Sequence, residues 1–175
     1  MYIEKIEISD DIFYIPEYEP YYMEPTVKPE RAVHPRVLIN NIDIHKIKEN
    51  IYKEGNKEFF ELHNNALLYS YENIPDTYDL KLIKYIKSNA FEYIINGDSE
   101  KGRKAVDTLI SYLKKVSFLG SSDYYLSGNL IYAAAITYDW CYNLIDDENK
   151  TQIIDIILNI ASKYTEIGWP PINQS

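Results

Sequence analysis

The chain has 175 residues, a length that fits one domain or part of a larger one. Its 27 acidic residues outnumber its 18 lysines and arginines, which gives a formal net charge of −9. Nucleic-acid binding is disfavoured, because neutralising phosphates requires a clustered basic face and the lysines here are scattered among more numerous acids.

Neither a secretion signal nor a membrane span is visible in the sequence. Met1 is followed by YIEKIEISDD, which lacks the basic start and the apolar run of a signal peptide. Charged residues interrupt every apolar run well short of the ~20 residues that a transmembrane helix needs. As written, the sequence predicts a cytoplasmic product that does not enter a membrane. Cys141 is the only cysteine, so it cannot form an intrachain disulfide, and the redox compartment stays open.

Residues 1–33 are predicted to form an extended arm. Prolines recur through this region and exclude a long helix, while short alternating pieces at 5–8 and 12–15 have the pattern of strands. The arm either lies on the surface of the following domain or is a loose leader. Both interpretations remain open.

The helical region is predicted to begin at residue 34. The segment HPRVLI, residues 34–39, starts in an extended conformation, because a residue that precedes proline avoids the helical region. Asn40 or Asn41 then caps a helix that runs to residue 51. A second helix is predicted over 56–72, ending before Pro75, and its expected buried side consists of Phe59, Phe60, Leu62, Leu67 and Leu68.

Two further helices are predicted over residues 80–96 and 98–116. Apolar residues recur at helical spacing in both segments. Gly97 between them suits the left-handed conformation that ends many helices, and Asp98 or Ser99 can cap the helix that follows. The two segments therefore form an antiparallel hairpin.

A second hairpin is predicted over residues 127–167. Ser127 is expected to cap a helix that runs to Leu144 and whose only charge is Asp139. A helix that is apolar on every side is expected to be enclosed by other helices, so this one is placed inside and the amphipathic helix after it outside. Gly168 and the two prolines at 170 and 171 end the second helix.

The fold class predicted from these elements is all-α. The two hairpins start about 47 residues apart and share one plan, as in stacked antiparallel helical hairpins. Such hairpins build either an open solenoid or an (α/α) toroid, and the periodicity does not choose between them.

Chemistry is sparse in this sequence. The three histidines, His34, His45 and His63, fall on different elements without metal-binding spacing or a neighbouring carboxylate. No phosphate loop and no nucleophile constellation is readable, and neither a cofactor nor a metal is expected.

Asp139 is the one charge in an apolar helix, so it must be paired or hydrogen-bonded to remain ionised. It either holds two hairpins together or, with Tyr138 and Trp140, borders a cleft that offers stacking surfaces to sugar rings. Trp169 follows the helix-ending glycine, and its loop either plugs the core or forms a cleft wall.

Four segments resemble motifs of the heparinase II/III-like polysaccharide lyases, in the same order and at similar spacing. HPRVL at 34–38 is similar to the segment before the family's first helix, YIINGD at 93–98 to a hairpin turn, and AAITYDWCYNL at 134–144 to an inner helix. GWPPINQS at 168–175 resembles the segment that leads into the family's catalytic histidine motif.

The resemblance implies that residues 34–175 are the N-terminal part of an incomplete (α/α) toroid. Enzymes of this family cleave uronic-acid glycosaminoglycans such as heparin or heparan sulfate by β-elimination, and they are typically secreted or periplasmic. Their catalytic histidine and tyrosine fall after the position of Ser175, so no catalytic residue is assigned here. The residues expected to contact an acidic polysaccharide are Tyr138, Trp140, Trp169 and Gln174. Alone, the chain is expected to be catalytically inactive and marginally stable.

Two other functions remain open. A stand-alone α-helical repeat module would bind a protein or a peptide along one face. A glycoside hydrolase on a toroid would need two carboxylates that face one cleft, and Asp139 is the only acid in the predicted inner helix.

Overall fold

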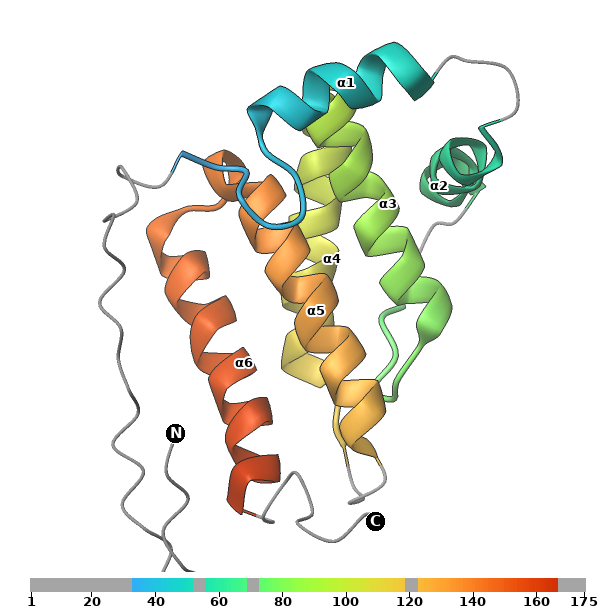
Figure 1. The fold of residues 1–175 in the computed structure, drawn as a ribbon. Helices are drawn as coiled ribbons and strands as arrows, with labels where there is room; N and C mark the ends of the chain where they lie inside the picture. Colours follow the sequence, from blue (N-terminus) through green and yellow to red (C-terminus); the bar gives the residue numbers. More distant parts are fainter. Residues whose placement is uncertain (1–32, 52–55, 69–72, 119–122, 167–175) are drawn as a thin grey trace, which may run out of the picture. The chain divides into compact units, whose positions relative to one another are not determined.

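The computed structural model describes residues 33–51, 56–68, 73–118 and 123–166, all within one compact unit. Over these ranges the chain is helical and contains no strand, which confirms the all-α prediction. The elements, shown in Figure 1, are α1 (Asn41–Ile51), α2 (Lys57–Leu68), α3 (Leu80–Asn96), α4 (Ser99–Lys115), α5 (Tyr124–Trp140), a short 3₁₀ turn η2 (Tyr142–Leu144), and α6 (Asp147–Glu166). Apart from Val33, the predicted arm lies outside the described residues.

The first predicted hairpin, α3–α4, forms as the capping residues indicate. Asp79 caps α3 by accepting hydrogen bonds from the backbone amides of Lys81 and Leu82, at 2.7 and 3.1 Å. Gly97 ends the helix with φ +73°, a conformation that glycine adopts without steric penalty. Asp98 then caps α4 through the amides two and three residues further on, both at 3.1 Å. Helix, turn and helix are therefore all set by local chemistry.

The start of α1 also follows the sequence. Asn40 is the capping residue, and its Oδ1 accepts from the amides of Ile42 and Asp43 at 2.8 and 3.1 Å. Ahead of it, the His34–Pro35 peptide bond is cis, and Leu38 turns the chain with φ +66°. For an L residue other than glycine this left-handed conformation costs on the order of 1 kcal/mol, so the surrounding contacts must hold the turn in place.

The prediction for the start and end of α5 was wrong. The helix begins at Tyr124, and Ser127 is buried inside it, where its Oγ donates to the carbonyl of Tyr124 at 2.9 Å instead of capping a first turn. The helix ends at Trp140, and the chain tightens into η2. The residues Tyr124, Tyr125 and Leu126, which precede Ser127, extend the helix upstream to Asp123.

Helices α3 to α6 build the main core. Each of α3 and α6 packs against both α4 and α5, and α4 also contacts α5. Successive helices run in opposite directions, so α3 and α5 point the same way (Figure 1). The fully buried side chains in this core include Leu82, Ile86, Leu109, Leu130, Ala134 and Ile153.

The expected buried side of α2 was partly wrong. Phe59 and Ala66 are buried, but Phe60 and Leu67 are 55% and 57% exposed. Helix α2 packs mainly on α3, and its two buried residues, Phe59 and Ala66, lie two turns apart on one face. Phe59 joins Ile51 of α1 and Ile95 of α3 in a second, smaller core.

Candidate functional site

Asp139 is the centre of a network that joins residues 34–37, called the HPRV segment below, to the end of α5. Its carboxylate is 2% exposed, and Oδ2 accepts hydrogen bonds from the backbone amides of Arg36 and Val37 at 2.7 and 2.8 Å. Oδ1 accepts from Nδ1 of His34 at 2.5 Å and lies 3.8 Å from Nε of Arg36. Both oxygens therefore have partners, which is what a buried carboxylate requires.

The neighbouring Trp140 contacts the same segment. Its indole Nε1 donates to the carbonyl oxygen of Val37 at 3.0 Å, and its ring lies 6.1 Å from that of Phe91 on α3. The predicted site residue Trp140 is thus half-buried and is tied to the HPRV segment by its only polar atom. One end of the indole anchors the chain, and the ring packs against α3.

Aromatic rings complete this network. His34 stacks on Tyr142 of η2 with ring centroids 3.8 Å apart, and Tyr138 meets Tyr142 edge to face at 5.6 Å. The Nζ atom of Lys150 lies 4.1 Å from the centroid of the Tyr142 ring, within cation–π distance. The predicted site residue Tyr138 therefore belongs to the same cluster as His34. Trp169 and Gln174, also predicted as site residues, lie outside the described residues.

The arrangement around Asp139 is suited to holding the chain together. Backbone N–H groups can only donate hydrogen bonds, and two of them bind Oδ2 of Asp139. That oxygen is therefore not available to take up a proton during a reaction. The His34 side chain is only 9% exposed, so little of its ring is open to a substrate. Of the two readings of Asp139 left open by the sequence, the structural one agrees with this geometry, although it joins α5 to the HPRV segment and not to another hairpin.

An exposed aromatic face lies along α5. Tyr125 is 71% exposed and Tyr132 is 46% exposed, and they lie two turns apart on the helix. An open pocket of about 370 Å³ is lined here by Tyr124, Tyr125, Gly128, Asn129 and Tyr132. From Ser127 onward α5 was expected to be enclosed by other helices, and for Tyr132 that expectation was wrong.

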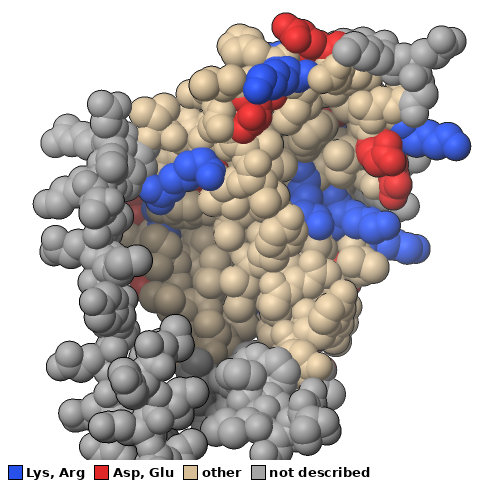
Figure 2. All heavy atoms as spheres, viewed as in Figure 1, with Lys and Arg blue, Asp and Glu red and all other residues tan. Residues whose placement is uncertain are grey.

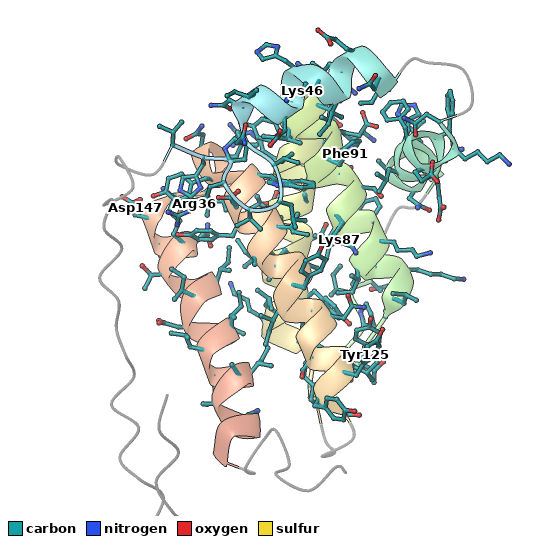
Figure 3. All side chains as sticks on the ribbon, viewed as in Figure 1. Arg36, Lys46, Lys87, Phe91, Tyr125 and Asp147 are labelled. Carbon is teal, nitrogen blue, oxygen red and sulfur yellow. The ribbon has the colours of Figure 1, made fainter. Side chains whose placement is uncertain are left out.

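Lysines of α3 border the aromatic face. Figure 2 shows basic side chains gathered over α3 beside a mostly uncharged surface over α5. The Nζ atom of Lys87 lies 5.6 Å from the centroid of the Tyr132 ring. Burial, and next the nearby charge of Lys84, lower the pKa of Lys87. Figure 3 shows Lys87 and Phe91 along α3, and Tyr125 towards the lower end of α5.

Two of the three histidines pair with carboxylates, which the sequence reading did not find. Besides His34, His63 of α2 lies 2.7 Å from Oε1 of Glu92 on α3, and Asn96 donates to the other oxygen of that carboxylate at 2.8 Å. The pairs are 105 and 29 residues apart in the chain, so local spacing carries no signal for either. The His63 pair ties α2 to α3 beside Phe59, whose ring stacks on the imidazole.

The described ranges contain no group of three or more histidine, cysteine or acidic side chains that could hold a metal ion. In the same ranges, no helix is both long enough and apolar enough to cross a membrane. No protein-family model matches the sequence, and no curated protein matches it either.

Proposed function

We propose that this chain is the N-terminal helical part of a heparinase II/III-like polysaccharide lyase, and that it binds an acidic polysaccharide without cleaving it. The catalytic groups of such an enzyme are not assigned to any residue of this chain. In this proposal the exposed face of α5 and the neighbouring lysines of α3 form part of the wall along which the polysaccharide lies.

One observation carries the proposal. Two of the segments that resemble lyase motifs, HPRV and the Tyr-Asp-Trp of α5, are about 100 residues apart and meet through Asp139 and Trp140. Their contact gives a physical reason for both motifs. The buried carboxylate of Asp139 requires hydrogen-bond donors, which the backbone of the HPRV segment supplies, and these hydrogen bonds in turn hold that backbone in its turn.

The arrangement of the hairpins also supports this reading. In a toroid of helical hairpins, the first helix of each hairpin belongs to the inner ring and the second to the outer ring. Helices α3 and α5 run in the same direction side by side, as inner helices would, and α4 lies behind them (Figure 1). The exposed face of α5 would then line the inside of the ring.

The side chains on this face suit an acidic sugar. Tyrosine rings offer flat apolar surfaces with a polar tip, which suits a pyranose that presents both C–H and O–H groups. Lys87, with one side against Tyr132, places a positive charge where a uronate carboxylate would lie. The net charge of −9 of the whole chain does not prevent this, because Lys87 lies directly against the Tyr132 ring of this face.

The proposal is tested by binding of the purified chain to immobilised heparan sulfate. Tyr125→Ala removes the most exposed ring of the α5 face and is expected to weaken binding about tenfold, or ~1.4 kcal/mol. Phe60→Ala is the matched control, since it removes an exposed aromatic ring from α2, away from this face, and it should leave binding unchanged. No unsaturated uronate absorbance should develop in either case.

Unsaturated uronate formed by the chain alone would contradict the proposed division between binding and catalysis. A folded chain that binds no acidic polysaccharide would contradict the proposal itself and would favour a helical module that binds a protein or a peptide. Phe60 and Leu67, both exposed on α2, give that second candidate a surface.

A further inference from the structure

A second pocket lies between α2 and α3, and it shares Lys87 with the border of the aromatic face of α5. Its volume is about 230 Å³, smaller than a typical drug-sized site, so it suits only a small ligand. Charged and polar side chains dominate its lining, which consists mainly of Glu58, Glu61 and Asn65 from α2 and Lys84, Lys87 and Ser88 from α3.

Of the two lysines that line this pocket, Lys84 forms an ion pair and Lys87 forms none with a described residue. Lys84 and Glu61 face each other at 3.7 Å, which partly satisfies both groups. Lys87 has no ion pair with any described residue, although it is partly buried. Its charge is partly withdrawn from water and is in contact with the Tyr132 ring, so an anion bound in the pocket would stabilise it further.

Ser88 provides an independent sign of a missing partner. It lies next to Lys87 in the chain, it lines the pocket, and it is fully buried. Its Oγ makes no hydrogen bond within the described part of the chain. A buried hydroxyl without a partner costs about 1–3 kcal/mol, so its presence beside an unpaired lysine points to a ligand that both groups bind.

We propose that this pocket binds a small hydroxy-monocarboxylate. The carboxylate would accept hydrogen bonds from the ammonium of Lys87 and the hydroxyl of Ser88. The ligand's hydroxyl groups would donate to the oxygens of Glu58 and Asn65 across the pocket. A second carboxylate or a phosphate is disfavoured, because Glu58 and Glu61 already place two negative charges at the rim.

The proposal does not rest on the polysaccharide-binding function. It predicts binding of a free acid in a pocket that Tyr125 does not line, so either proposal can fail while the other holds.

The proposed binding of a carboxylate by Lys87 also predicts that affinity depends on pH. Because burial and the neighbouring Lys84 lower the pKa of Lys87, affinity should begin to fall at a pH below the ordinary lysine value of 10.5.

The experiment compares gluconate with sorbitol, which has the same carbon chain and hydroxyl groups but no carboxylate. Titration of the full chain, followed by calorimetry and by amide chemical shifts, should show binding of gluconate and not of sorbitol, with shifts centred on residues 84–88. Lys87→Met should weaken gluconate binding at least about tenfold and Ser88→Ala severalfold. Lys81→Met, an exposed lysine of the same helix outside the pocket, serves as the control and should change nothing.

Ser88→Ala keeps the experiment decisive even if Lys87→Met disturbs the fold, because it removes an unpartnered hydroxyl and should not lower stability. Equal binding of gluconate and sorbitol would overturn the proposal. So would the absence of gluconate binding, or wild-type affinity in the folded Ser88→Ala variant.

Discussion

The buried carboxylate of Asp139 accepts hydrogen bonds from three groups of the HPRV segment. It accepts from two consecutive backbone amides and from an imidazole, and these contacts hold the turn in which Leu38 adopts its left-handed conformation. A single oxygen-bearing side chain thereby offsets the backbone strain of the turn and positions the start of α1.

Replacing Asp139 should therefore be among the most destabilising changes in the chain. Asp139→Asn puts an N–H donor where an oxygen now accepts, which leaves buried donors facing a donor. We expect a loss of about 2–4 kcal/mol in the free energy of unfolding, measured by urea denaturation. Asp155→Asn, an exposed aspartate on α6, is the control and should shift the midpoint very little. Equal midpoints for the two variants would show that the Asp139 network contributes nothing to stability.

Cys141 and Tyr112 predict a loss of stability in alkali. Burial raises the pKa of the Cys141 thiol from 9.0 to about 12 and that of the Tyr112 hydroxyl from 10.0 to about 12. Between these values the unfolded chain has released protons that the folded chain retains, so the free energy of unfolding falls as pH rises. Each group contributes at most about 1.4 kcal/mol per pH unit.

The measurement is the urea midpoint at pH 8, 9 and 10. The wild-type midpoint should fall from pH 9 upward, where only the thiol of the two groups titrates at first. In Cys141→Ala the decline between pH 9 and 10 should be clearly shallower. Parallel curves for the two proteins would contradict a buried, protonated thiol at this position.

At the scale of whole elements, helices α3, α4 and η2 approach closely at Gly102. A Cβ atom there would clash with Cδ1 of Leu144 and would lie 2.8 Å from Cγ of Tyr93. Gly128 on α5 is the opposite case, because a Cβ there would meet nothing within 4 Å. Comparing the same substitution at the two glycines therefore separates the effect of helix packing on stability from that of intrinsic helix propensity.

Alanine at these positions should act in opposite directions. Gly128→Ala should stabilise the protein by up to ~1 kcal/mol, through helix propensity alone. Gly102→Ala gains the same propensity but must displace Leu144 and Tyr93, so we expect a net loss of about 1–3 kcal/mol. Thermal melts of the two variants check this, and a stabilised Gly102→Ala variant would show that the helices separate more easily than their packing indicates.

The elements that the sequence predicted best are those with local signals. Asp79, Gly97 and Asp98 have capping chemistry that acts within three or four residues, and the α3–α4 hairpin matches its prediction. The start of α5 was missed because Asp123 and Ser127 are both of a type that caps helices, and the sequence alone does not say which of them precedes the first turn. In α2 the apolar residues are more numerous than one neighbour can cover, so the pattern could not say which of them are buried.

At the scale of the whole molecule, the relations that define the candidate site could not be predicted. Asp139 was recognised as needing a partner, but nothing in its own helix identifies His34, because the two are 105 residues apart. The exposure of Tyr125 and Tyr132 could not be predicted either. Tyrosine is compatible with both a core and a surface, and the apolar pattern of α5 does not reveal which of its faces lacks a neighbour.

The distance along the chain between the two sides of the Asp139 network also bears on how the protein is made. The HPRV segment leaves the ribosome about 100 residues before Asp139, so α1 is synthesised long before its anchor exists. The α3–α4 hairpin has its contacts close together in sequence and can form as soon as it emerges, because short loops close at low entropic cost. We therefore expect α1 to dock only after translation has completed α5.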